Sequence, residues 1–159
     1  MRKNESLILD PQVHPLQAFV SDGLQLGDVL ERLLQFTGTS RVLVSTYSVG
    51  EEFLRRCLLL RKRGLISFLT IIADTKAADK TARLHVMVRR VADEVRLCQN
   101  HSKVLLVDGA RLSVLVLTSQ NQTRGNRLEN YTVIRDSAIM GDIIHSLNHL
   151  NTATVWKSI

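Results

Sequence analysis

The sequence has few aromatic residues, few prolines and few glycines, and each shortage excludes a class of protein. Phe, Trp and Tyr together make up 4% of the chain, which argues against a protein that holds single-stranded nucleic acid by stacking bases on aromatic rings. Two prolines and eight glycines exclude a collagen-like chain and a disordered Pro/Gly-rich chain. The remaining composition, 45% hydrophobic and 23% charged, is that of a soluble globular protein.

The chain also lacks the features of a secreted or membrane-spanning protein. No apolar run approaches the roughly 20 residues that cross a bilayer, and the stretch Leu7-Ile8-Leu9 is too short for a signal peptide. Cys57 and Cys98 lie far apart and form no CxxC pair, so we expect two buried thiols in a reducing compartment. The sequence therefore predicts a cytoplasmic protein with no membrane partner.

Length and charge set the next limits. A chain of 159 residues fits one domain with its own hydrophobic core, and we expect a single domain over residues 1–159. Residues 1–22 are expected to be partly irregular because Pro11 and Pro15 interrupt them. The net charge of +6 and the pI near 9.8 favour a polyanionic partner such as nucleic acid or anionic lipid. A generically basic protein without such a partner fits the charge equally well.

Hydrophobic periodicity predicts helices that alternate with strands. Asp28 is a suitable N-cap for the first helix, Gly38 ends it, and Gly64 ends the second helix. The predicted helices cover residues 28–37, 51–63, 81–91 and 138–150. The predicted strands cover residues 7–9, 41–49, 65–73, 95–98, 103–107, 111–117 and 130–134, with a turn at Asp108-Gly109.

The order of these elements predicts an α/β fold. The strand, helix and strand over residues 41–73 form a βαβ unit with parallel strands. The two strands over residues 103–117 form an antiparallel hairpin. We therefore expect one mixed central β-sheet flanked by helices on both faces.

Polar side chains are grouped near the ends of three neighbouring predicted strands. Side chains two residues apart point to the same side of a strand, so His101 and Lys103 share one side, and Ser119 and Asn121 share another. Glu129 lies where the next strand begins. These residues can converge on one small pocket; alternatively, His101 and Lys103 are only a polar strand edge.

The same residues carry a resemblance to a known family. His101-Ser102-Lys103, followed by four apolar residues and Asp108, resembles the HxKx4D signature of the phospholipase D superfamily. Thr118-Ser119-Gln120-Asn121 resembles that family's Gly-Ser-x-Asn, and Glu129-Asn130 resembles the pair that begins its following strand. The likeness spans nearly the whole chain and is strongest to the small single-motif bacterial endonucleases of the superfamily. It implies a phospholipase D-like fold.

The resemblance also implies a role for each residue. A neutral His101 imidazole attacks phosphorus and forms a covalent phosphohistidine, while Glu129 fixes its tautomer. Lys103 and Asn121 bind the nonbridging phosphate oxygens, and Ser119 adds a hydroxyl donor. Asp108 is expected to be architectural. No metal and no other cofactor is required.

One imidazole cannot perform both proton transfer and attack, and the chain contains no second His-x-Lys. We therefore expect a homodimer that pairs two His101 side chains across its two-fold axis, one as nucleophile and one as general acid. His145 and His149 are spaced as a metal pair, but the sequence shows no third ligand, so no metal site is predicted.

Two departures from the family pattern keep alternatives open. Thr118 replaces a glycine, and the interval from Asp108 to Thr118 is longer than usual. Arg124 and Arg127 either bind flanking phosphates or belong to a solvated loop. The favoured function is a metal-independent endonuclease that acts on DNA. The alternatives are a phospholipid phosphodiesterase or phosphatidyltransferase of the same superfamily, and a catalytically inert paralogue that binds nucleic acid.

Overall fold

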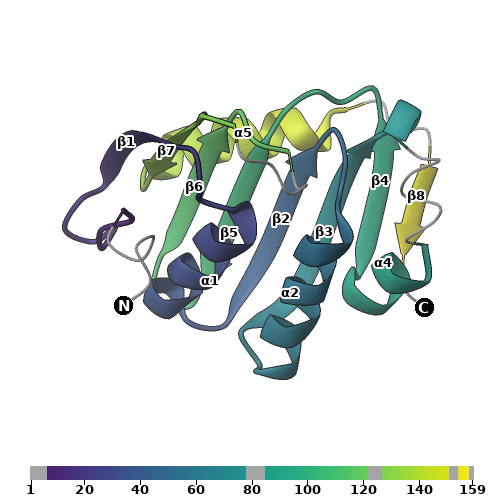
Figure 1. Cartoon of the computed structure of the whole chain (residues 1–159), viewed down its shortest axis with the longest axis horizontal. Coiled ribbons are helices and arrows are strands. Elements are labelled where there is room, and N and C mark those ends of the chain that lie inside the picture. Colours follow the sequence, from purple (N-terminus) through teal and green to yellow (C-terminus); the bar gives the residue numbers. More distant parts are fainter. Residues whose placement is uncertain (1–6, 78–84, 122–126, 151–153, 158–159) are drawn as a thin grey trace.

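Eight strands form one mixed sheet in the computed structural model, which describes residues 7–77, 85–121, 127–150 and 154–157. The order across the sheet is β1-β7-β6-β5-β2-β3-β4-β8, with β1 and β8 at its edges (Figure 1). Among the described neighbouring strands, the pairs β2-β3 and β3-β4 are parallel, and the other pairs are antiparallel. The strands are β1 Leu16–Ser21, β2 Ser40–Thr46, β3 Ile66–Asp74, β4 Glu94–Cys98, β5 Val104–Gly109, β6 Ser113–Thr118, β7 Glu129–Ile134 and β8 Thr154–Lys157.

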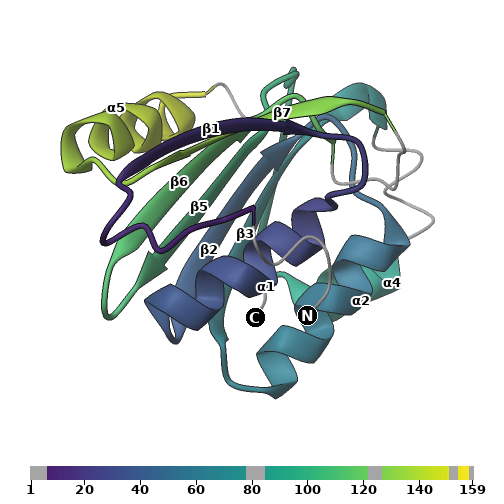
Figure 2. The same cartoon turned by 60° about the vertical axis from the view of Figure 1, so that its left-hand side comes forward.

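Helices cover both faces of this sheet, as Figure 2 shows. The helices α1 (Leu26–Thr37), α2 (Glu51–Lys62) and α4 (His85–Val91) pack on one face over the larger core cluster. Helix α5 (Ser137–Asn148) packs on the other face over a smaller core cluster. A short 3₁₀ turn, Thr75–Ala77, follows β3. The α/β class and the βαβ unit β2-α2-β3 are therefore confirmed.

Strand β3 is the hydrophobic centre of the fold because both of its faces are covered. Its residues Leu69 and Ile71 face the helices α1, α2 and α4, while Ile72 faces α5, and all three are buried. A nearly continuous apolar run is the pattern expected of a strand buried on both faces. Cys57 and Cys98 are buried free thiols, as expected. Burial raises the pKa of Cys57 to about 12.

The first prediction that the structure contradicts is the strand at residues 7–9. Those residues form no strand, and the segment expected to be irregular contains β1 instead. β1 pairs antiparallel with β7 over its whole length. The Gln17 side chain accepts a hydrogen bond from Leu9 N at 2.9 Å and donates one to Leu9 O at 3.1 Å. The alternating pattern after Pro15 therefore makes the edge strand, and the chain before it folds back on that strand.

Two boundary predictions are also wrong. Helix α1 begins at Leu26 with Gln25 as its N-cap, so Asp28 lies in the first turn and contacts Arg56 rather than capping. Asp108 and Gly109 are the last residues of β5, and the turn follows them. Strand β8, which antiparallel pairing adds to β4, was not predicted. The predicted helix over residues 81–91 lies partly outside the described residues, which include only its end as α4.

The sheet topology decides where functional side chains gather. Strands β5 and β7 run antiparallel to their neighbours, so they begin at the edge of the sheet where β2, β3, β4 and β6 end. This edge is a row of strand ends and is different from the lateral edges formed by β1 and β8. His101, Ser119 and Glu129 all lie at this edge. None of the described helices is long and apolar enough to span a membrane.

Candidate active site

His101 and Lys103 lie in the connection between β4 and β5, at the edge just described. His101 is exposed and Lys103 is half-buried. Lys103 Nζ lies 3.3 Å from His101 Nδ1 and donates to the His101 carbonyl oxygen at 2.8 Å. Because an ammonium group can only donate, this contact favours the imidazole tautomer with its proton on Nε2. The two side chains therefore form one polar unit that solvent can reach.

The ring of Tyr47 is a further neighbour of His101. Tyr47 follows β2 at the same edge, and its ring centroid lies 5.8 Å from that of His101, with the planes tilted by 55°. From the sequence, Tyr47 has no predicted role and lies inside the strand predicted over residues 41–49. Because β2 ends at Thr46, Tyr47 is the first residue after the strand and lies beside His101.

Ser119 and Glu129 lie together, after the end of β6 and at the start of β7. Ser119 Oγ donates a short hydrogen bond to Glu129 Oε2 and accepts one from Asn130 N at 3.1 Å. Within the described chain, no hydrogen bond joins Glu129 to His101. The pairing of these two residues stays a prediction, and the observed partner of the carboxylate is Ser119.

Thr118 and Gln120 fix the backbone that carries Ser119 and Asn121. Thr118 Oγ1 donates to the Asn130 carbonyl at 2.7 Å and accepts from Gln120 N at 3.1 Å. The Gln120 amide nitrogen donates to the Leu24 carbonyl at 3.1 Å. Thr118 therefore closes the strand pair β6-β7 with its hydroxyl at the position where the family pattern has glycine.

Asn121 has a buried side-chain oxygen, Oδ1, that makes no hydrogen bond to the described part of the chain. A buried amide oxygen without a donor is unfavourable by about 1–3 kcal/mol. A bound molecule or a neighbouring chain that supplies a donor at this point would therefore be stabilised.

Behind His101 lies a buried polar cluster that sequence reasoning missed, formed by Ser45, Asp74, Asn100 and Ser102. Asn100 N donates to Asp74 Oδ2 at 2.6 Å, and Ser102 Oγ donates to Asn100 Oδ1 at 2.7 Å. The hydrogen bond from Asn100 N is the main cause of the lowered pKa of Asp74. The only sequence signal was that these polar residues lie at the ends of apolar strands, where a loop is also expected to be polar.

The other predicted residues are Asp108, Arg124 and Arg127. Asp108 lies at the opposite end of β5 from Lys103, and its Oδ1 accepts a hydrogen bond from Ser113 Oγ. Arg127 is exposed, and Arg124 lies outside the described residues. In the described part of the chain, no group of three His, Cys, Asp or Glu residues is placed to hold a metal ion. The ring centroids of His145 and His149 lie 4.0 Å apart, with the ring planes tilted by 36°.

Searches with the sequence found no matching family model and no matching curated protein. Solved structures do match by shape. Phosphatidylserine synthase from Haemophilus influenzae has a TM-score of 0.61 and 15% identity over 86% of this chain and 39% of its own. Polyphosphate kinase from Porphyromonas gingivalis has a TM-score of 0.58 and 12% identity, over 83% of this chain and 22% of its own.

A third match is the archaeal chromatin protein TrmBL2, described with a novel mode of DNA binding. It has a TM-score of 0.51 and 12% identity, over 83% of this chain and 51% of its own. The chain thus spans between about a fifth and a half of these proteins. At such low identity the likeness concerns the fold alone. Because the first two matches have phospholipase D superfamily folds, this chain has the phospholipase D-like fold, a mixed sheet with helices on both faces.

Proposed function

We propose that this protein is a metal-independent phosphodiesterase that cleaves DNA through a phosphohistidine at His101. The observation that carries the proposal is the exposed contact between His101 and Lys103, at the sheet edge where Ser119, Asn121 and Glu129 also lie. A nucleophilic imidazole beside an ammonium and an amide is suited to hold and attack a phosphodiester.

The reaction proceeds in two displacements. The lone pair of His101 Nε2 attacks phosphorus, the bond from phosphorus to the leaving oxygen breaks, and that oxygen takes a proton from an imidazolium. Water then attacks the phosphohistidine, the nitrogen–phosphorus bond breaks, and the second imidazole takes the proton of the water. Lys103 and Asn121 bind the nonbridging oxygens, whose charge grows as the attacking bond forms.

The contact between Lys103 and His101 makes the tautomer part of this mechanism. Attack from Nε2 needs the proton on Nδ1, the nitrogen that faces Lys103 Nζ. A phosphate oxygen competes for the ammonium and releases Nδ1, which takes a proton from solvent water while Nε2 gives its own proton to water. Glu129 then accepts the hydrogen bond from Nδ1, since its second carboxylate oxygen has acceptor capacity beyond Ser119.

The second imidazole is His101 of another copy of the chain. The sequence holds a single His-x-Lys, and isologous pairing across a two-fold axis brings the same residue of two copies together. DNA is the proposed substrate because the chain carries a net charge of +6, and positive charge favours a polyanion. TrmBL2, with a fold like this one, is described as binding DNA.

The test compares the purified protein with His101→Ala on plasmid DNA in excess EDTA, followed by an alkaline denaturing quench, which preserves the acid-labile nitrogen–phosphorus bond, and detection of phosphohistidine. We expect cleavage and a trapped phosphohistidine for the unmodified protein only. His14→Ala is the matched control, because this exposed histidine precedes β1 at the opposite edge of the sheet. Undiminished cleavage by clean His101→Ala would overturn the assignment.

The same assay distinguishes the other candidates. The fold likeness to a phosphatidylserine synthase favours a phospholipid headgroup as the second substrate, so vesicles of anionic phospholipid form a parallel arm. Turnover of the vesicles without DNA cleavage would identify a phospholipid phosphodiesterase or phosphatidyltransferase. Salt-sensitive DNA binding with no turnover of either substrate would identify an inert nucleic-acid-binding protein.

A further inference from the structure

The buried cluster of Ser45, Asp74, Asn100 and Ser102 holds the backbone on both sides of His101. Asn100 is 6% exposed and uses all its polar side-chain atoms. Its Nδ2 donates to Ser45 Oγ at 2.9 Å and to the carbonyl oxygens of Thr46 at 3.2 Å and Ile72 at 3.1 Å. The Asn100 side chain therefore joins the ends of β2 and β3.

The other end of the Asn100 amide binds Ser102, the residue that follows His101. Asn100 Oδ1 accepts from Ser102 N at 2.9 Å and from Ser102 Oγ at 2.7 Å, and Ser102 Oγ also lies 2.6 Å from Ser45 Oγ. The residues immediately before and after His101 are thus both fixed to the sheet. His101 itself, with Lys103, is left to face the reacting side of this edge.

Asp74 completes the cluster from the end of β3. It is 6% exposed, and its two oxygens accept backbone hydrogen bonds from Asn100 N at 2.6 Å and Lys76 N at 2.7 Å. These donors, with the nearby charges of Lys76 and His101, lower the pKa of Asp74. The carboxylate is therefore ionised at neutral pH and bound to the backbone directly before His101.

We propose that Asp74 and Asn100 are positioning residues, which hold the His101-Lys103 backbone where the nucleophile meets phosphorus. This inference rests on the proposed function. Neither residue contacts the reacting atoms; each acts through the backbone that carries His101. A small displacement of a nucleophile lowers the rate because attack requires close alignment, so loss of either residue reduces kcat more than it affects KM.

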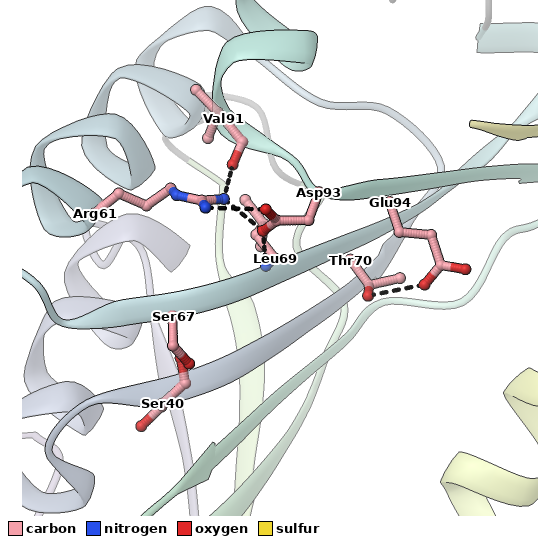
Figure 3. A network of polar contacts seen from close by, with 8 residues as sticks. All are labelled: Ser40, Arg61, Ser67, Leu69, Thr70, Val91, Asp93 and Glu94. Carbon is pink, nitrogen blue, oxygen red and sulfur yellow. Dashed lines mark hydrogen bonds and ion pairs between the residues drawn. The ribbon is translucent and has the colours of Figure 1, made fainter. Parts of the chain in front are cut away.

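A second aspartate of the same sheet supplies the matched control. Asp93 is the residue directly before β4, and its Oδ2 accepts a hydrogen bond from Leu69 N in β3 at 2.7 Å. Its carboxylate also binds the Arg61 guanidinium, so it joins β3 to the chain that leads into β4 (Figure 3). Asp93 directly precedes β4, whereas Asp74 is the last residue of β3, and these two strands are parallel. The two carboxylates therefore lie at opposite ends of the strands. A role in stability alone predicts similar behaviour for both.

The experiment compares Asp74→Asn with Asp93→Asn at a temperature where both are folded. We expect both to lower Tm, and only Asp74→Asn to lower kcat per folded molecule, by about 10- to 100-fold, with little change in KM. Ser102→Ala, which removes only an exposed residue's hydroxyl, tests the cluster if Asp74→Asn fails to fold. Ser102→Thr restores the hydroxyl and should recover most of the activity.

A readout that does not need activity separates the two proposals. In ¹⁵N-histidine-labelled protein, Asp74→Asn and Ser102→Ala should broaden or shift the His101 ring signals, and Asp93→Asn should leave them unchanged. Unchanged His101 signals together with unchanged kcat in both cluster variants would overturn the positioning role. If the unmodified protein cleaves no phosphodiester, the proposed function falls, and the ring signals alone decide whether the cluster orders His101.

Discussion

At the scale of single residues, the buried Tyr131 holds the chain segment that carries Ser119 and Asn121. Tyr131 is 1% exposed, and its hydroxyl lies 2.7 Å from the Leu24 carbonyl and 3.1 Å from Gln120 Oε1. Its ring stacks on Phe19 at 5.3 Å between centroids. Gln120 lies between Ser119 and Asn121, so this buried bond fixes the stretch that carries both side chains.

Tyr131→Phe is therefore expected to lower the free energy of unfolding by about 1–2 kcal/mol, because it removes the hydroxyl donor to Gln120 Oε1 and leaves the Leu24 carbonyl with Gln120 Nε2 as its side-chain donor. Urea unfolding at neutral pH measures the change. Tyr47→Phe is the control, since Tyr47 is only half-buried, and its expected effect is within about 0.5 kcal/mol. Equal stability of Tyr131→Phe and the unmodified protein would refute the supporting role of this hydroxyl.

At the scale of elements, the close packing of β5 against the end of α1 depends on a glycine. Gly109 ends β5, and a Cβ added there would lie 2.5 Å from the carbonyl oxygen of Thr37, the last residue of α1. The same Cβ would lie 2.6 Å from Ser40 Oγ, where β2 begins. Three elements meet too closely at this point for any side chain.

Gly109→Ala should thus lower the free energy of unfolding by about 1–3 kcal/mol, since backbone must move to admit the methyl group. Thermal unfolding followed by circular dichroism measures this. Gly23→Ala is the matched control, because its added Cβ meets nothing within 4 Å. If both variants melt at the same temperature, the packing of β5 against α1 is looser than described.

The Asp93 carboxylate joins Arg61 of α2 and Leu69 of β3 to the chain directly before β4. Its ionisation makes the free energy of unfolding depend on pH. Burial opposes ionisation of Asp93, but the hydrogen bonds from Arg61 and Leu69 N outweigh it and lower its pKa below the ordinary 3.8. A lowered folded-state pKa gives stability that is present above about pH 4 and is lost as the pH falls through the folded-state value.

Asp93→Asn is accordingly expected to weaken the fold near neutral pH and to flatten the loss of stability on acidification. Unfolding by urea at neutral pH and at about pH 3 measures both effects. The gap in stability between variant and unmodified protein should narrow as the pH falls. A gap that stays constant with pH would show that the charge of Asp93 does not contribute.

At the scale of the whole molecule, the proposed mechanism needs two copies of the chain. We expect a dimer in sedimentation velocity at micromolar concentration, because a single copy provides one His-x-Lys. Mixing the unmodified protein with excess His101→Ala, after exchange of subunits, should reduce activity below that of the unmodified protein alone. A heterodimer has one imidazole and lacks either the acid or the nucleophile.

Two results of these experiments would contradict the shared site. A fully active monomer would contradict the shared site, and activity that does not fall on mixing would show that each copy works by itself. Mixing with His14→Ala is the control, since exchange with this variant leaves both His101 residues in place.

The sequence was enough to predict the class of fold and to place the candidate site residues at the ends of strands. Apolar periodicity separated strands from helices because burial on one or both faces leaves a period in the chain. The spacing from His101 to Lys103, and from Ser119 to Asn121, identified residues that lie at one edge of the sheet. Edge elements were the weak point: in β1, exposed residues alternate with half-buried ones, and none is fully buried to create a strong pattern.

Only the tertiary structure decided which polar residues work together. Asp74, Asn100 and Ser45 lie far apart in the sequence, and the order β5-β2-β3-β4 brings them to one buried point. The pairing of β6 with β7 likewise places Ser119 within hydrogen-bonding distance of Glu129. A strand pattern records which side chains are buried but not which strands are neighbours, so the contacts behind His101 appear only once the sheet is assembled.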